Sequence, residues 1–572
     1  MTLIGAIRGL RRSSWWDALR NSRWTGVAIV VALHLAALTI MVVTEFEWRA
    51  TTLFLLTWGL LNGLFLLLLR RPAVAAALSL ILIAILLVLS IFKSWAIWTT
   101  INFFDFLIVN TDTVAFLLGV FPELLTTVIA GVAIAIPLLA LIWWIDPFRV
   151  RRGAGAAVAT GCLAGIVGIS LAMPEQPAES FQGINHISNF SRSGVLAVSE
   201  LMTKGWMELD ATPDRLQSAG GESCQPARKP PHIVLVLDEA SFDITAAPGI
   251  KVPTDYARHF QSFDGKTRKF VVEGSGGPTW YTEYNVLTGL SARSYGNLKF
   301  YVTRIAADRV ERGLPHALRR CGYKTYSLYP AYGAFLSARR FQTSAGVERF
   351  IDLADMKAEF VEPDRFYYDQ ALRLLERDRD GKPKFIFVYT VANHFPWHER
   401  YRPGDTPEWR DLGNEFEVDE YIRRQTMSAH DYQDFIARLK RDHPEESFLV
   451  VRFGDHQPAF SPQVVEPGLN DAEIGRRLML QDPRYYTTYY AIDAVNFTPA
   501  DLSLALDRLE APYLPLVIQE AAGLPLDPSF AEQKKILERC QGVFYLCAGG
   551  TEARRFNRLL IDAGLIKGMV SR

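Results

Sequence analysis

The chain has 572 residues, more than one ordinary domain holds, so the sequence predicts at least two parts. Its 61 basic and 61 acidic side chains give a formal net charge of zero, and this balance offers no electrostatic support for nucleic-acid binding. Hydrophobic residues make up 49% of the chain, but they are distributed unevenly along it.

Residues 1–173 contain long apolar runs that predict an all-α transmembrane domain. We expect five spans, at 25–44, 51–69, 73–92, 124–145 and 154–173. Each is about 20 residues long with little charge, the length needed to cross roughly 30 Å of hydrocarbon. The first span is too long for a cleaved signal peptide, and further spans follow it at once.

Arginines gather before the first span and in the second and fourth connections: Arg8, Arg11, Arg12, Arg20 and Arg23, then Arg70 and Arg71, then Arg149, Arg151 and Arg152. The other two connections carry only Arg49 and Lys93. Cytoplasmic loops are the ones enriched in Lys and Arg. The pattern therefore predicts a multi-pass protein of the bacterial inner membrane, with everything beyond residue 174 on the periplasmic side.

The connection 93–123 is aromatic and interrupted by Asn and Asp, which predicts an interfacial segment and not a sixth span. Two roles are open for this segment: it helps to hold a lipid headgroup, or it is only an amphipathic connector. Residues 174–230 are predicted to be a linker that contains an amphipathic helix within 193–209. The Gly-, Ser- and Pro-rich stretch 217–231 marks the end of the linker.

The predicted outer domain, residues 231–572, alternates apolar strands with helical patterns. The clearest strands are 232–238, 385–391 and 447–453, and they are almost continuously hydrophobic. Strands buried on both faces of a parallel sheet have this composition. The sequence thus predicts a doubly wound α/β domain.

Four cysteines follow the last predicted span: Cys224, Cys321, Cys540 and Cys547. An oxidising compartment allows them to form two disulfides. The short separation of Cys540 and Cys547 favours their closing a small loop, which leaves Cys224 with Cys321. The other pairings and four free thiols remain open.

Metal-ligating residue types follow the three predicted strands. Glu239 follows the first, Asn393 and His394 follow the second, and Asp455 and His456 follow the third. Ligands of such sheets bind at the carboxyl ends of the strands. Carboxylates combined with imidazoles suit Zn²⁺ or Mn²⁺, so we expect one divalent metal at this edge.

A fourth feature is the glycine-rich run that leads into residues 278–290. Pro278 suits the start of a helix, which places Thr279 in the first turn. Exposed amides and the helix dipole there favour an anion, and a metal can activate the hydroxyl. The alternative is that Thr279 only caps a core helix.

Taken together, DEAS (238–241), GGPT (276–279) with LTG (287–289), ANHFP (392–396) and FGDH (453–456) resemble the sulfatase/alkaline-phosphatase superfamily. The five spans narrow the resemblance to membrane-bound phosphotransferases, and the closest likeness is to lipoteichoic acid synthase-like phosphoglycerol transferases. In many members of the superfamily the nucleophile precedes a Thr-Gly pair at a spacing that here leads from Thr288 to Thr279, and not to Thr282.

The resemblance implies that Glu239, Thr279, Asp455 and His456 bind the metal and that Thr279 is the catalytic nucleophile. Thr279 would take a headgroup phosphate from a membrane phospholipid, with phosphatidylglycerol favoured, release diacylglycerol and form a phospho-threonine. A hydroxyl on a glycan or glycerol acceptor would then take the group. His394 would contact the phosphate or the headgroup, or assist the leaving group.

The sequence departs from the family in the substrate region. The headgroup triplet Trp-Asn-Arg is absent from 329–342, where Arg339 or Arg340 can replace its Arg in a shifted register. Trp280 and His398 are further candidate substrate contacts. Gln457 and Pro458 follow His456, so the longer motif of the lipid A phosphoethanolamine transferases is also absent.

Three alternatives to a phosphoglycerol transferase remain open. One is a phosphoethanolamine transferase on the same scaffold. Another is a phosphodiesterase or sulfatase-type hydrolase; sulfatases require a Cys or Ser where this chain has Thr279. The last is a membrane sensor without activity, against which all four ligand residues argue. Asp238, beside Glu239, is expected to support the site without ligating.

Overall fold

The computed structural model describes residues 22–568, apart from 98–99, 108, 110, 121–122, 174–182, 204, 217–223 and 360. Parts of the predicted interfacial connection and of the predicted linker lie outside these residues. The chain divides into two compact units, one of Met1–Asn110 and Leu117–Thr203 and one of Thr111–Phe116 and Lys204–Arg572.

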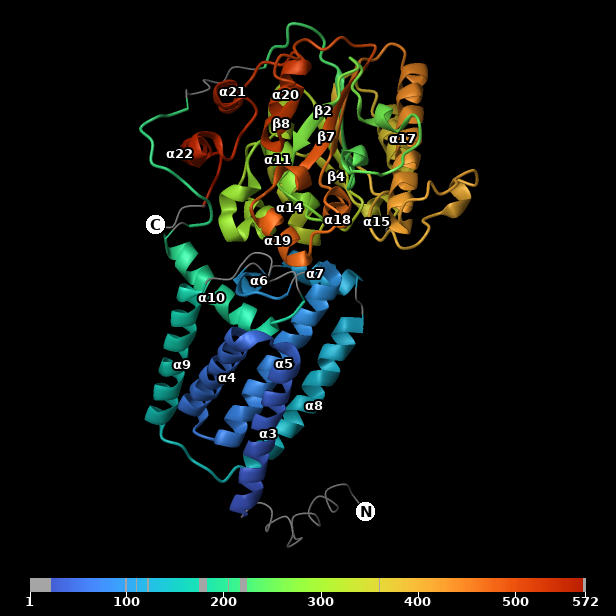
Figure 1. The fold of residues 1–572 in the computed structure, drawn as a ribbon. Helices are drawn as coiled ribbons and strands as arrows, with labels where there is room; N and C mark the ends of the chain where they lie inside the picture. The colour runs from blue at the N-terminus through green and yellow to red at the C-terminus, as the bar shows by residue number, and fades with distance from the viewer. Residues whose placement is uncertain are drawn as a thin grey trace, which may run out of the picture. The chain divides into compact units, whose positions relative to one another are not determined.

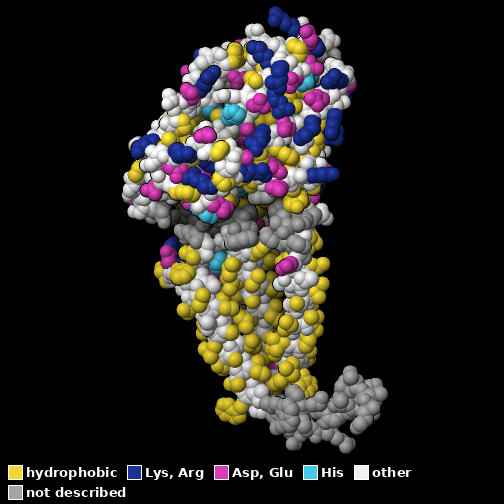
Figure 2. All heavy atoms as spheres, turned by 90° about the vertical axis from the view of Figure 1, so that its right-hand side faces the viewer, with side chains coloured by type: hydrophobic (Ala, Val, Ile, Leu, Met, Phe, Trp, Pro, Cys, Tyr) yellow, Lys and Arg dark blue, Asp and Glu magenta, His cyan; other side chains and the backbone are white. Residues whose placement is uncertain are grey.

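Five long apolar helices confirm the predicted membrane-spanning domain: α3 (Arg23–Thr44), α4 (Glu47–Leu69), α5 (Pro72–Ile97), α8 (Glu123–Ile145) and α9 (Arg152–Ala172). All five are long and apolar enough to cross a membrane. Hydrophobic side chains cover most of the visible surface of this unit (Figure 2). Membrane helices pack through small residues, and a Cβ added to Gly63 of α4 would lie 2.6 Å from the backbone nitrogen of Ala159 on α9.

The amphipathic helix expected within 193–209 is α10 (His186–Thr203), and it both begins and ends earlier than the hydrophobic pattern indicated. Its polar first turns are stabilised by contacts that the pattern does not reveal. A carboxylate oxygen of Glu45 accepts from the backbone N–H of Ile187 at 2.9 Å, and Nδ1 of His186 lies 2.8 Å from the hydroxyl of Ser90. Buried polar groups need such partners. Two short helices, α6 (Phe103–Leu107) and α7 (Thr111–Val120), lie in the predicted interfacial connection.

The second unit is built on one eight-stranded sheet with the order β4-β3-β5-β1-β6-β7-β2-β8. The strands are β1 (His232–Asp238), β2 (Arg268–Val271), β3 (Lys324–Leu328), β4 (Arg349–Ile351), β5 (Lys384–Tyr389), β6 (Phe448–Gly454), β7 (Thr487–Val495) and β8 (Arg508–Glu510). The three strands read from the sequence are β1, β5 and β6, which lie side by side and parallel at the centre. The sheet is mixed, because β7 runs antiparallel to β6 and β2.

Helices cover both faces of the sheet, which confirms the α/β class; Figure 1 shows α11 and α20 on one side of the sheet and α17 on the other. The helices are α11 (Thr279–Thr288), α12 (Val302–Ala306), α13 (Leu314–Arg320), α14 (Ala338–Ser344), α15 (Leu353–Met356), α16 (Asp364–Arg377), α17 (Phe416–Asp442), α18 (Ser461–Val465), α19 (Asp471–Met479), α20 (Leu514–Ala521), α21 (Pro528–Cys540) and α22 (Thr551–Asp562). Two disulfides, Cys224–Cys321 and Cys540–Cys547, agree with the favoured pairing.

Candidate active site

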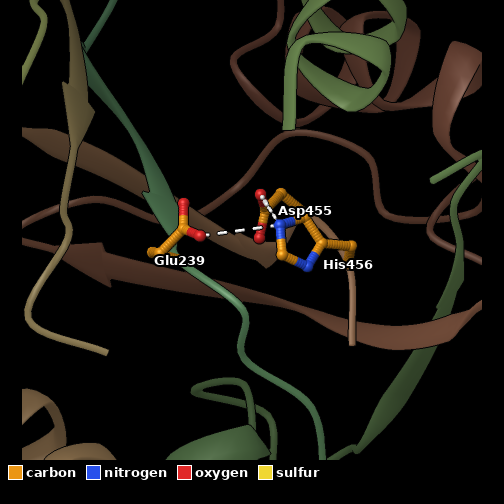
Figure 3. Close-up of side chains that lie close together, drawn as sticks. All are labelled: Glu239, Asp455 and His456. Carbon is orange, nitrogen blue, oxygen red and sulfur yellow. Dashed lines mark ion pairs between the residues drawn. The ribbon is translucent and has the colours of Figure 1, made fainter. Parts of the chain in front are cut away.

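Two neighbouring strands bring together three residues that can hold a metal. β1 and β6 are paired in register up to Asp238 opposite Gly454, so Glu239 and Asp455, the next residues of each strand, lie side by side. Nε2 of His456 is 3.5 Å from Oε1 of Glu239 and 3.2 Å from Oδ2 of Asp455 (Figure 3). All three side chains are buried, and their ligand atoms lie within 4.8 Å of one another.

Gly454, the last residue of β6, has a steric reason to be glycine. A Cβ at this position would lie 1.8 Å from the carbonyl oxygen of Ser241, closer than non-bonded atoms can approach. The segment after β1 therefore packs directly on the end of β6. Any larger residue would separate the two strand ends that carry the candidate ligands.

Thr279 is the first residue of α11, and its hydroxyl oxygen lies 3.2 Å from Nε2 of His456. The loop before it is held to the segment after His456, because the N–H of Gly276 donates to the carbonyl of Gln457 at 3.0 Å. Gly276 has φ +74°, a left-handed conformation that favours glycine. The glycine-rich run thus forms a turn that places the threonine beside the carboxylate–imidazole cluster.

The hydroxyl of Thr282, three residues further along the helix, is used in a structural hydrogen bond. It donates to the backbone carbonyl of Asp455 at 2.6 Å and is fully buried. The carboxylate of Asp455 is held from the other side, where Oδ1 accepts from the N–H of Ala240 at 2.8 Å. Nδ1 of His456 lies 2.9 Å from the carbonyl of Gln457, which aims Nε2 at the two carboxylates.

The electrostatics of this cluster fit a divalent cation. Burial, followed by the nearby charge of Glu239, raises the pKa of Asp455 to about 7. Burial lowers the pKa of His456, but Asp455 and Glu239 outweigh it and raise that pKa to about 9. The buried Oδ2 of Asp455 lies 3.2 Å from Nε2 of His456 and has no hydrogen-bond partner in the described part of the chain. Two crowded carboxylates and an imidazole form a donor set that suits Zn²⁺ or Mn²⁺.

The four candidate substrate residues have different surroundings. His394 follows β5 at the same edge of the sheet, and its Nδ1 lies 2.8 Å from the carbonyl of Phe395. Trp280 donates its indole N–H to the carbonyl of Phe300 at 2.8 Å, while His398 is exposed. Arg339 pairs with Asp352 and Asp355 at 2.7 and 3.0 Å, so its charge is already partly neutralised within the domain.

A buried polar cluster behind β1 and β6 was not found from the sequence. The carboxylate of Asp238 lies 2.8 Å from Nε2 of His259 and accepts from the hydroxyl of Tyr489 at 2.5 Å. Arg452 donates to the carbonyl of His259 at 2.8 Å. As expected, Asp238 faces away from the three candidate ligands. The charged Arg452 inside the apolar strand 448–454 was the available signal, since a charge is rarely buried without partners.

The model of the sulfatase family matches residues 233–489, a range that includes all six residues proposed from the strand ends and α11. A capsular polysaccharide biosynthesis protein, RkpI of Rhizobium meliloti (strain 1021), is 28% identical over 239 residues. That match covers 40% of this chain and 41% of RkpI, so the chain spans less than half the length of this relative.

Two solved structures illustrate the structural neighbours. Phosphoglycerol transferase GacH of Streptococcus pyogenes, in complex with sn-glycerol-1-phosphate, has a TM-score of 0.45 and 16% identity and covers 60% of this chain and 86% of its own. Lipooligosaccharide phosphoethanolamine transferase A of Neisseria meningitidis has a TM-score of 0.42 and 14% identity and covers 84% of this chain and 96% of its own.

Proposed function

We propose that this chain, whose residues 233–489 form a sulfatase-family domain, is a membrane-anchored phosphotransferase with Thr279 as its nucleophile. It transfers a phosphoglycerol group from a membrane phospholipid, with phosphatidylglycerol favoured, to an extracytoplasmic glycan or glycerol acceptor. One observation carries the proposal: the Thr279 hydroxyl lies at a helix N-terminus, 3.2 Å from the imidazole of a buried carboxylate–imidazole cluster.

Glu239, Asp455, His456 and the oxygen of Thr279 are the residues that would hold one divalent metal, Mn²⁺ or Zn²⁺. Such a metal supplies positive charge that stabilises phosphoryl oxygens and lowers the pKa of the threonine hydroxyl. The N–H groups of Thr279 and Tyr281 already donate to the carbonyls of Gly277 and Pro278, at 2.9 and 3.0 Å, so the start of α11 offers the donor phosphate chiefly the positive end of the helix dipole. The metal, when bound, would supply charge to the same phosphate.

The reaction has two displacements. In the first, the oxygen of Thr279 bonds to phosphorus while the bond from phosphorus to the diacylglycerol oxygen breaks. The threonine proton is transferred to that leaving oxygen, and His394 at the end of β5 assists this transfer. In the second, an acceptor hydroxyl bonds to phosphorus, the bond to Thr279 breaks, and the threonine regains a proton.

The membrane helices support this choice of donor. A lipid donor never leaves the bilayer, and an enzyme anchored beside it meets the donor at a high effective concentration. Five helices of the chain are long and apolar enough to provide that anchor. The arginine pattern and the two disulfides favour a periplasmic position of the catalytic unit, at the inner membrane of a bacterium.

The test is intact mass spectrometry of the purified full-length chain after incubation with phosphatidylglycerol and Mn²⁺, and separately with phosphatidylethanolamine and Zn²⁺. A glycerophosphate adduct on the wild type, absent from Thr279→Ala, is the expected result. Thr551→Ala is the matched control, because Thr551 also begins a helix but lies exposed on α22. This control should form the adduct normally.

Each other outcome points to a different reaction. A phosphoethanolamine adduct would replace phosphoglycerol with phosphoethanolamine as the transferred group. Release of diacylglycerol without an adduct or an acceptor-linked product would identify a hydrolase. An adduct that persists in Thr279→Ala would reject Thr279 as the nucleophile, and the absence of both adduct and lipid cleavage would reject the proposed activity.

A further inference from the structure

An open pocket of about 360 Å³ lies beside β4, the edge strand of the sheet, and it is separate from the candidate active site. We call it the β4 groove. Four arginines line it, together with one acidic residue and the ring of Phe350: Arg339, Arg349, Arg373, Arg377 and Asp355. The charged lining is therefore strongly positive, although the chain as a whole carries no net charge.

One wall of the groove is a single face of α16. Arg373 and Arg377 are spaced four residues apart on this helix, which places both guanidinium groups on the same side. Like charges at this spacing repel each other. Arg349 lies opposite them as the first residue of β4. Three positive side chains from two elements thus converge on one open space.

The protein itself does not neutralise these three arginines. Arg339 pairs with Asp352 and Asp355, at 2.7 and 3.0 Å. By contrast, the side chains of Arg349, Arg373 and Arg377 have no ion pair or hydrogen bond in the part of the chain that the structure describes. Guanidinium groups bind carboxylates and phosphates through two parallel hydrogen bonds. The vacant donors of the groove fit a ligand with several anionic groups.

The position of the groove relates it to the active site. In the sheet, β4 is separated from β1 by β3 and β5, and three strand spacings of about 4.8 Å give about 14 Å. β4 is parallel to β3, β5 and β1, and Arg349 is in register with Val234, five residues before Glu239. Arg349 therefore lies toward the amino ends of the strands, as does Arg377, which precedes the Asp378 that pairs with Lys324 at the start of β3. Five residues at about 3.3 Å each add about 16 Å along the strands to the distance across them. A small headgroup cannot occupy both places at once. A chain of several sugar units can.

We infer that the β4 groove binds the acceptor, and that the acceptor is an anionic glycan chain whose carboxylates or phosphates contact Arg349, Arg373 and Arg377. This inference rests on the proposed function, since it assigns the second substrate of the same reaction. The lipid donor reacts at Thr279, whereas the acceptor is held away from the reaction centre and presents one hydroxyl to it. Charge recognition in the groove would select acidic chains over neutral ones.

The experiment measures binding of fluorescently labelled oligomers to the full-length chain in lipid nanodiscs. The probes are hexagalacturonate, a glycerol-phosphate hexamer and the neutral maltohexaose, and the competitors are inorganic phosphate and a single-stranded oligonucleotide. The groove variant is Arg373→Gln with Arg377→Gln. The matched control is Arg258→Gln with Arg508→Gln, which removes the same charge from exposed positions, one of them on β8 at the opposite edge of the sheet.

We expect at least one anionic hexamer to bind and maltohexaose not to. The groove variant should weaken binding about tenfold or more, while the control binds like the wild type. Added salt should weaken binding, because the groove is open to solvent. The tighter of the two anionic probes then identifies carboxylate or phosphate as the group recognised.

The inference is overturned if maltohexaose binds equally well, or if the groove variant binds like the wild type. Equal loss in the control variant would also overturn it, since binding would then follow total charge. Inorganic phosphate binding as tightly as a hexamer would mean a site for one small anion, and tighter binding of a single-stranded oligonucleotide would reject a glycan. Binding is measured without catalysis, so a missing Thr279 adduct in the wild type would reject the proposed function alone.

Discussion

The hydroxyl oxygen of Thr279 lies 3.2 Å from Nε2 of His456, although 177 positions separate the two residues in the chain. The contact exists because a left-handed turn at Gly276 leads into α11 at the point where β6 ends. It joins the candidate nucleophile to a buried cluster that contains two carboxylates. The consequences of this arrangement can be measured with and without a metal.

Asp455→Asn should change the thermal stability of the chain differently with metal and without metal. Without metal, the amide oxygen can still accept from the N–H of Ala240, and one of two crowded carboxylates is gone. The melting temperature in EDTA is therefore expected to be unchanged or higher. With Mn²⁺ or Zn²⁺ at about 100 times the dissociation constant, the wild type should gain about 3 kcal/mol and the variant much less. Thermal unfolding with and without metal is the measurement.

The matched control for this experiment is Asp442→Asn, at the exposed end of α17, where Asp442 pairs with Arg441. It should keep the full gain from metal. If Asp455→Asn gained as much stability as the wild type, the assignment of Asp455 as a ligand would be wrong.

Arg424 should control the loop that carries His394. Its guanidinium donates to the carbonyls of His394, Pro396 and Glu399 at 2.8, 2.8 and 3.1 Å. Lysine keeps the charge but lacks the planar fork that reaches several carbonyls. Arg424→Lys is expected to raise the KM for the lipid donor about tenfold, equal to about 1.4 kcal/mol, with a smaller change in kcat.

Steady-state kinetics and limited proteolysis of the loop 393–402 check this prediction. Faster cleavage of the loop should accompany the rise in KM. Arg441→Lys, on the same helix but exposed, is the control and should behave like the wild type. An unchanged KM with a more easily cleaved loop would show that the loop does not contact the donor.

Asp364, the first residue of α16, should make stability fall as pH rises. Burial, followed by the nearby charge of Asp238, raises the pKa of Asp364 from 3.8 to about 8. Between these two values the folded chain keeps a proton that the unfolded chain has released, so the unfolded state binds fewer protons. Rising pH then favours unfolding through this window.

Asp364→Asn removes the titrating carboxyl group. Its amide oxygen can still accept from the N–H of Ala392, which in the wild type donates to Oδ1 of Asp364 at 3.0 Å. Relative to the wild type, its free energy of unfolding should increase by about 1 kcal/mol per pH unit between about pH 5 and pH 8. Urea unfolding followed by tryptophan fluorescence measures the difference. Asp369→Asn, on the same helix and paired with Arg438, is the control. A constant difference across the window would contradict the prediction.

The two disulfides should contribute unequally to stability. Cys224 and Cys321 are 97 positions apart, whereas Cys540 and Cys547 are 7 apart. A crosslink restricts the unfolded chain more when it closes a longer loop, which gives about 5 kcal/mol for the first and about 2 kcal/mol for the second. Paired Cys→Ser variants and denaturant unfolding test the order. A larger loss from the short loop would contradict this explanation.

Local features of the sequence were sufficient to predict the membrane helices and the central strands. A hydrocarbon span requires a long apolar run, and a strand buried on both faces requires a continuous one, so α3, α4, α5, α8 and α9 and strands β1, β5 and β6 could be read without tertiary information. The residues that follow parallel strands share one edge of the sheet. That rule brought Glu239, Asp455 and His456 to one place in advance.

Only the tertiary structure determined the contacts that depend on strand order and on packing between distant segments. The antiparallel β7 supplies Tyr489 to Asp238, and the edge position of β4 creates a groove with α16. Arg339, which the sequence placed among the substrate contacts, is paired with Asp352 and Asp355. Apolar patterns determine which faces of an element are buried, but the partner that each polar side chain meets is set by the register and order of elements far apart in the chain.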